Sequence, residues 1–173
     1  QRGQRAEAGH VPALADQPID VVVGQLGAAG EAKAFYRELA ASPAFAATEA
    51  WIDLAVADYD ALLLPGGHAP RMRQYLGSPV LQLRVAEFWA LERPVAAICH
   101  GAQILTAAQV LTGRACCAYP SVQPEIELAG GTFIPPSATF DNAHVDGNLV
   151  SAAAWPAHPA WIRAFRRVLG DVE

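Results

Sequence analysis

Hydrophobic residues along this chain fall into short continuous runs that alternate with segments of helical periodicity. Apolar runs at 19–23, 61–64 and 95–98 are bounded by turn-forming or polar residues, and their length predicts buried strands. Apolar residues recur every three or four positions over 30–41 and 79–91, which predicts amphipathic helices. Strands that alternate with helices in this way indicate a parallel sheet covered by helices on both faces.

Each predicted helix has one apolar face, and we expect that face to pack against the sheet. In the helix at 30–41 it carries Phe35 and Leu39. A third helix is predicted at 159–169, near the end of the chain. The expected apolar faces of the other two helices are Val80, Leu83, Phe88 and Leu91 in 79–91, and Trp161, Ile162, Phe165 and Leu169 in 159–169.

Beyond residue 113 the pattern changes to short strands. We predict strands at 115–119 and 132–134, with a short helix or turn at 124–129 between them. Asp146-Gly147 within 143–151 predicts a β-hairpin, because this pair tolerates the positive φ that a tight turn requires. Residues 44–58 predict a connection, anchored by Trp51 and Ile52. Residues 1–18 lack periodicity, and we expect them to be mostly irregular.

The stretch with the strongest chemical signal is PVAAICHGAQIL at 94–105. The strand at 95–98 gives way to a helix-favouring run at 102–111 within a few residues, which requires a tight bend at Cys99. Gly101 allows the two backbones to approach closely there. This is the geometry of a nucleophile elbow. A thiol at the start of a helix is favoured as thiolate, so we predict a strained backbone and a lowered pKa for Cys99. The alternative role for a free cysteine is a small buried hydrophobe.

Composition narrows the class of protein. The chain has 173 residues, of which 53% are hydrophobic and 17% charged, and this suits one domain over 1–173 with an irregular or divergent segment at 1–29. A net charge of −5 with scattered arginines predicts no nucleic-acid partner. No apolar run has a membrane-spanning length and no signal peptide opens the chain, so we predict a cytoplasmic protein with no membrane contact.

The histidine, cysteine and glycine residues outside the elbow do not form a pattern typical of a metal or cofactor site. No cluster of histidine, cysteine and carboxylate has metal-ligand spacing, so we predict no metal and no cofactor. The glycine pair at 66–67 lacks the lysine of a phosphate-binding loop. Cys116 and Cys117 lie in a predicted strand, whose alternation sends them to opposite faces as packing residues rather than a disulfide. We expect His144, in a strand, and His158, at a helix start, to be structural.

Four stretches together resemble the ThiJ/PfpI family of the class I glutamine amidotransferase-like superfamily. They are LLLPGGHAP (62–70), PVAAICHGAQIL (94–105), AYP (118–120) and VDGNLVSAAAWPAHPAW (145–161). The resemblance extends from about residue 30 to the end of the chain. It implies a flavodoxin-like three-layer α/β/α sandwich with a mostly parallel sheet, here without the family's first strand and helix. It also implies a homodimer or a higher homo-oligomer.

The resemblance assigns roles to residues around the elbow. Cys99 takes the place of the family's low-pKa nucleophile, and His100 that of an adjacent histidine that some members pair with the thiol. Gly67 and the backbone N–H of His100 would form an oxyanion hole. Gly66, His68 and Tyr119 would line the pocket, although a solvated loop position is an equal alternative for His68.

Two departures from the family pattern bear on activity. Family members have a first strand that ends in an acid hydrogen-bonded to the thiol, and no such strand is found here. We expect either that the sequence is truncated and begins after that strand, or that the run at 19–23 substitutes for it, in which case Glu31 is a weak replacement for the acid. Members with a protease assignment carry an acid just after the Pro-Gly-Gly loop, where this chain has Arg71. This substitution weakens the peptidase interpretation.

These features predict an enzyme that uses Cys99 as a nucleophile on a small carbonyl or amide substrate, as a hydrolase or a glyoxalase-like enzyme. The thiolate would attack, loop amides would hold the oxyanion and an imidazole would move the proton. Substrates could be a 2-oxoaldehyde, an amide or a peptide. The alternative is a redox-sensing or stress-protective protein whose Cys99 is oxidised. A third interpretation is a partial domain without a ligand.

Overall fold

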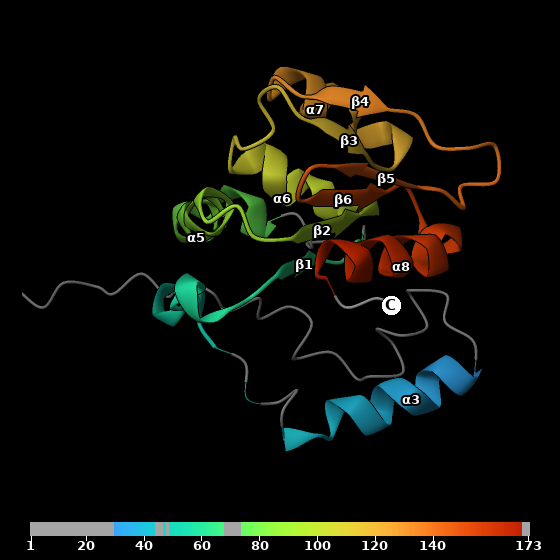
Figure 1. Ribbon diagram of the computed structural model, residues 1–173. Helices are drawn as coiled ribbons and strands as arrows, with labels where there is room; N and C mark the ends of the chain where they lie inside the picture. The colour runs from blue at the N-terminus through green and yellow to red at the C-terminus, as the bar shows by residue number, and fades with distance from the viewer. Residues whose placement is uncertain (1–29, 44–46, 48, 68–73, 171–173) are drawn as a thin grey trace, which may run out of the picture.

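The computed structural model of the chain describes residues 30–43, 47, 49–67 and 74–170 (Figure 1). A four-stranded sheet has the strand order β1-β2-β6-β5, and a separate sheet pairs β3 with β4 in parallel. Strands β1, β2 and β6 are parallel, whereas β5 is antiparallel to β6. The strands are β1 Leu62–Leu64, β2 Val95–Ile98, β3 Ala115–Cys117, β4 Thr132–Ile134, β5 Ala143–Asp146 and β6 Leu149–Ala152.

Helices cover both faces of the larger sheet (Figure 1). The α-helices are α3 Gly30–Ala40, α5 Pro79–Ala90, α6 Ala102–Ala107, α7 Gln123–Leu128 and α8 His158–Val168. The short 3-10 helices are η1 Trp51–Asp53, η2 Val56–Asp58, η3 Gln74–Gly77, η4 Cys99–Gly101, η5 Pro120–Val122 and η6 Trp155–Ala157. The predicted α/β architecture with a mostly parallel sheet is therefore confirmed.

Strand β2 lies at the centre of the fold because all four of its residues are apolar and can be buried on both faces. Val95 and Ala97 pack into a cluster with Phe88 of α5. Ala96 and Ile98 pack into a second cluster, which contains residues of α8. Parallel pairing on both sides brings the carboxyl ends of β1, β2 and β6 to one edge of the sheet.

Helix α5 begins and ends where the sequence predicts, but its buried face differs from the expected one. The Ser78 side chain caps its start by accepting a hydrogen bond from the backbone N–H of Leu81. Val85 and Phe88 are buried, whereas Leu83 is 54% exposed and the following Leu91 is also exposed. Leu83 lies roughly 200° around the helix axis from Val85, at about 100° per residue. The prediction that Leu83 and Leu91 face the sheet is therefore wrong.

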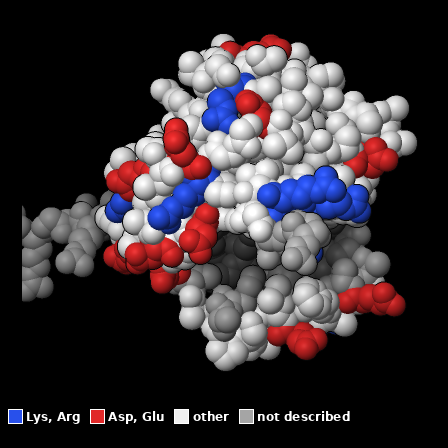
Figure 2. All heavy atoms as spheres, in the orientation of Figure 1, with Lys and Arg blue, Asp and Glu red and all other residues white. Residues whose placement is uncertain are grey.

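Helix α8 packs its apolar face on β6. Trp161 and Phe165 are buried as predicted, and the Trp161 Nε1–H donates to the carbonyl oxygen of Val150 at 3.2 Å. Ile162 and Leu169 are exposed, so their predicted burial is wrong. Figure 2 shows a row of basic side chains along α8 on its solvent side, and the exposed arginines of this helix are Arg163, Arg166 and Arg167.

Two other predicted contacts are absent. In α3, Phe35 is 66% exposed and Leu39 is exposed, and Figure 1 shows this helix apart from the sheet. Ile52 is exposed and does not anchor its connection. Trp51 does hold this segment, because its backbone carbonyl accepts from Arg84 Nε at 3.1 Å. The sequence-predicted strand at 19–23 lies outside the described residues.

The helix after the elbow is shorter than predicted. It ends at Ala107, because Gln109 adopts a φ of 57° that a right-handed helix cannot accommodate. Leu111, expected as its last residue, lies beyond the helix and is fully buried. Among the described segments, no helix combines the length and the apolar character needed to cross a membrane.

The hairpin of β5 and β6 forms as predicted, with Asp146 paired to Leu149 and Gly147 at a φ of 58°. Asp146 also connects the two sheets. Its Oδ2 atom accepts from the backbone N–H of Ala115 in β3 at 2.7 Å and from Arg114 Nε at 3.1 Å. The smaller sheet is thereby fixed against the antiparallel edge of the larger one.

Candidate active site

Cys99 occupies a sharp junction between β2 and a helical segment. Ile98 is still extended, with φ −133° and ψ 143°, and Cys99 then has a φ of 59° in the left-handed region. The chain continues through η4 into α6. A left-handed non-glycine residue costs about 1–3 kcal/mol and persists where its surroundings enforce it. The prediction of a strained elbow at Cys99 is confirmed.

Two glycines explain how the elbow fits against β1. A side-chain carbon at Gly101 would collide with the carbonyl oxygen of Leu64 and lie 2.8 Å from that of Pro65. A side-chain carbon at Gly66 would lie 2.6 Å from the Cβ atom of Cys99 and 3.4 Å from its Sγ atom. The loop after β1 therefore lies directly against the cysteine.

A cavity of about 680 Å³ opens beside the elbow. The structure brings five of the sequence-predicted site residues to it. Cys99 and His100 are partly exposed there. The described residues that line the cavity are Pro65, Gly66, Gly67, Ile98, Cys99, His100, Tyr119, Trp155, His158 and Trp161.

Three other residues considered in the sequence analysis are not part of the described site: the predicted pocket residue His68, the weak acid replacement Glu31, and Arg71, which stands where some family members carry an acid. His68 and Arg71 lie outside the described residues. Glu31 is exposed in the first turn of α3 and does not line the cavity. No carboxylate occurs among the described lining residues, so the described part of the site supplies no acid beside the thiol.

His100 is held in place on both sides of its ring. Its Nδ1 atom lies 3.2 Å from the Sγ atom of Cys99, and its Nε2 atom lies 3.4 Å from the Oγ atom of Ser121. The ring stacks on Tyr119 with centroids 5.3 Å apart and an interplanar angle of 25°. A proton can therefore pass between the thiol and Nδ1, while Ser121 and Tyr119 fix the orientation of the imidazole.

The electrostatics of Cys99 differ from the sequence-based expectation. Burial raises the pKa of the Cys99 thiol above its ordinary value, and the backbone N–H of His100 acts in the opposite direction. The prediction of a lowered pKa is therefore wrong for this arrangement. The helix that follows has only six residues, and no charged side chain occurs among the described lining residues. The proton acceptor that the described part of the site places beside the thiol is Nδ1 of His100, 3.2 Å from Sγ.

Three cavity residues were missed by the sequence reasoning. Trp155, His158 and Trp161 come from η6 and α8, which follow β6 directly. The sequence does not show which strand lies next to β2, and only the observed parallel pairing of β6 with β2 brings the end of β6 to the same edge of the sheet as Cys99. The observed register pairs Ile98 with Ala152, three residues before Trp155.

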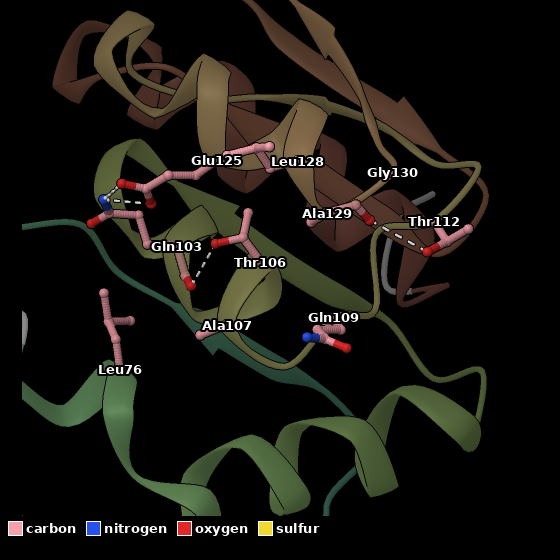
Figure 3. Close-up of a pocket in the computed structure, with 10 residues that line it drawn as sticks. All are labelled: Leu76, Gln103, Thr106, Ala107, Gln109, Thr112, Glu125, Leu128, Ala129 and Gly130. Carbon is pink, nitrogen blue, oxygen red and sulfur yellow. Dashed lines mark hydrogen bonds between the residues drawn. The ribbon is translucent and has the colours of Figure 1, made fainter.

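A second cavity, of about 660 Å³, lies between η3, α6 and α7 and is distinct from the Cys99 site (Figure 3). Gln103 is buried at its wall, and its Nε2 atom donates to both carboxylate oxygens of Glu125, at 3.0 and 2.8 Å. Figure 3 shows these two side chains pointing toward one another. The pair satisfies a buried amide and joins α6 to α7.

Cys116 and Cys117 are fully buried and unbonded to each other, as predicted. Burial raises the pKa of Cys116 to about 12 and that of Cys117 to about 11. His144 lies in β5 and His158 begins α8, at the positions expected, but His158 also lines the Cys99 cavity, which the expected structural role did not include. Among the three thiols, Cys99 is the one that reaches a cavity.

The fold and the elbow define an α/β protein with a strained, cavity-lining cysteine at the carboxyl edge of a parallel sheet. Comparison with known sequences is consistent with this class. The profile of the DJ-1/PfpI family matches residues 16–167. The chain therefore belongs to the DJ-1/PfpI family, and the resemblance found in its motifs is confirmed.

Individual relatives match part of the chain. It is 48% identical over 126 residues to Protein DJ-1 homolog D of Arabidopsis thaliana, covering 73% of this chain and 32% of that protein. It is 37% identical over 116 residues to Deglycase PfpI of Pyrococcus furiosus, covering 65% and 63% of the two chains. The chain thus spans less than two thirds of either relative. The crystal structure of a ThiJ/PfpI domain protein from Brachyspira murdochii shares the fold, with a TM-score of 0.60, 18% identity, and coverage of 72% of this chain and 68% of that one.

Proposed function

We propose that this chain is a cysteine-dependent enzyme that acts on small reactive carbonyl compounds, such as 2-oxoaldehydes and their adducts. The observation that carries the proposal is the 3.2 Å approach of His100 Nδ1 to Cys99 Sγ at the wall of an accessible cavity. A relative with 37% identity is named a deglycase, which supports carbonyl chemistry over peptide hydrolysis.

The proposed reaction begins with transfer of the Cys99 proton to Nδ1 of His100. The sulfur then forms a bond to the aldehyde carbon, and the electron pair of the C=O bond moves to oxygen. Backbone N–H groups of Gly67 and His100 are the proposed donors to this oxyanion. Return of the proton from His100 to the oxygen completes a neutral thiohemiacetal.

With a 2-oxoaldehyde, the thiohemiacetal carbon then loses its hydrogen as a proton and the neighbouring carbonyl carbon gains one. This internal redox step gives a thioester of a 2-hydroxy acid, with no external oxidant. Water attacks the thioester carbon, the C–S bond breaks, and the thiol takes up a proton. The balance is one 2-oxoaldehyde and one water converted to one 2-hydroxy acid. His100 is the proposed proton carrier both in the formation of the thioester and in its hydrolysis.

Conversion of methylglyoxal to lactate tests the proposal. We expect turnover by the wild-type chain, its loss in Cys99→Ser, and a decrease of about 10²-fold or more in His100→Ala. Leu128→Ala is the matched control, because this side chain is 88% exposed on α7 and does not line the Cys99 cavity. Turnover that survives Cys99→Ser would overturn the proposal.

A second candidate is a redox-responsive thiol, and the burial of the three cysteines favours it. Cys99 is partly exposed, whereas Cys116 and Cys117 are fully buried. Peroxide would therefore reach one thiol selectively, oxidising its sulfur to sulfenic acid while peroxide is reduced. This role needs no carbonyl substrate, so absence of turnover together with selective oxidation would favour it.

A further inference from the structure

Trp155 is an unusual residue for the wall of a reaction cavity. Its indole is 73% exposed, although it lies in η6 immediately after the buried strand β6. It lines the same cavity as Cys99, together with the partly exposed ring of Tyr119 and the buried ring of Trp161. A large apolar side chain left open beside a nucleophile is a surface available for ligand contact.

The size and chemistry of the cavity indicate what kind of group would cover this indole. A volume of about 680 Å³ is far more than a three-carbon oxoaldehyde fills and lies within the range used for drug-sized ligands. The described lining residues include three aromatic side chains and two imidazoles but no Lys, Arg, Asp or Glu. Ring stacking, rather than charge pairing, is therefore the recognition that these side chains can offer.

We propose that the Cys99 cavity selects carbonyl compounds that carry a planar aromatic group, and that Trp155 is the residue that confers this selectivity by stacking on the ring. The statement about substrates rests on the proposed function, since it concerns compounds turned over at Cys99. The stacking itself does not depend on turnover. It can be measured with any reagent that reacts once with the Cys99 sulfur.

The first measurement compares the alkylation of Cys99 by iodoacetanilide and by iodoacetamide. In both reactions the sulfur displaces iodide and forms a C–S bond, and the reagents differ in a phenyl ring on the amide nitrogen. The rate constant for iodoacetanilide is divided by that for iodoacetamide, and this ratio is divided by the same ratio measured with glutathione. The normalised ratio reports recognition of the phenyl ring by the protein. We expect this normalised ratio to exceed one and to fall about 3- to 10-fold in Trp155→Ala, as stacking on one ring allows.

Two variants control this experiment. Trp155→Phe should retain most of the preference, because a smaller ring still stacks. Phe35→Ala removes another exposed aromatic side chain, on α3 and outside the cavity, and should leave the ratio unchanged. Trp155 is exposed, so its variants should keep the thermal transition of the wild-type chain.

The second measurement compares kcat/KM for phenylglyoxal and methylglyoxal. A preference for phenylglyoxal that is lost in Trp155→Ala supports the inference. A Trp155-dependent alkylation preference without turnover of either aldehyde retains the aromatic site and overturns the proposed function. Turnover of methylglyoxal with no aromatic preference in either measurement overturns the inference and retains the function.

Discussion

The Nδ1 atom of His100 lies 3.2 Å from the Sγ atom of Cys99, although the two residues are neighbours in the chain. The left-handed conformation of Cys99 and the 3-10 turn that follows bring the two side chains together. An extended strand would send them to opposite faces of the sheet. The strained elbow therefore does two things: it exposes the sulfur and it places a proton acceptor beside it.

The reactivity of Cys99 should keep increasing with pH up to a higher pH than the reactivity of an ordinary thiol does. Burial raises its pKa, so the thiolate is the minor form at neutral pH and becomes more abundant as the pH rises. We expect the rate of iodoacetamide labelling at Cys99 to keep rising beyond about pH 8.5, where a free cysteine is half ionised. Mass spectrometry of the labelled peptide over a pH series measures this rate, with glutathione as the reference. A plateau well below pH 8.5 would contradict the raised pKa.

Replacement of Gly101 by alanine should disrupt the elbow. The new Cβ atom would collide with the carbonyl oxygen of Leu64 and press on that of Pro65, neither of which can move without displacing β1. We expect a loss of about 1–3 kcal/mol in the free energy of unfolding, measured by urea denaturation. Gly77→Ala is the matched control, because no atom lies within 4 Å of its added carbon. Equal stability of the two variants would show that the elbow is not packed as described.

Mild peroxide treatment should add oxygen to Cys99 and leave Cys116 and Cys117 unmodified. The latter two are fully buried, and burial holds their pKa values at about 12 and about 11, so neither access nor ionisation favours reaction. Tandem mass spectrometry of the treated native protein locates the added oxygen. In the urea-unfolded chain all three thiols should react alike. Oxidation of Cys117 at the same rate as Cys99 in the native protein would contradict this ranking.

The parallel sheet and the elbow could be predicted because their signals are local. The four apolar residues of β2 and the residues Cys99 and Gly101 are contiguous, and each step in that stretch has its own backbone requirement. The family resemblance directed attention to Gly66, Gly67 and Tyr119, and the structure places all three at the Cys99 cavity.

The parts that could not be predicted depend on geometry between distant segments. Trp155 reaches the cavity because β6 pairs with β2, and the stretch that contains it, residues 145–161, does not itself show this pairing. The pKa of Cys99 depends on how deeply the sulfur is buried, which the order of residues does not reveal. Leu83 is exposed because a different face of α5 packs against the sheet. The helix has leucines on more than one face, so the sequence pattern does not decide which face is buried.

Removal of the Asp146 carboxylate should destabilise the protein at neutral pH and matter less in acid. The backbone N–H of Ala115 and the Arg114 guanidinium hold the pKa of Asp146 below its ordinary value. A lowered folded-state pKa means that its contribution to stability is fully present above the unfolded value of about 3.9. This contribution is lost as the pH falls through the lower folded-state pKa.

Asp146→Asn should therefore reduce the free energy of unfolding at pH 7 by about 1 kcal/mol, a modest figure because the carboxylate is about one-third exposed. The difference from wild type should begin to shrink below about pH 3.9 and should be lost below the lower folded-state pKa, where both side chains are neutral. Urea unfolding across that pH range measures it. Asp53→Asn, at an exposed carboxylate in η1, is the control and should show little change at any pH. If the Asp146→Asn difference instead grew in acid, the carboxylate would be destabilising when charged, and its assigned role in joining the two sheets would be wrong.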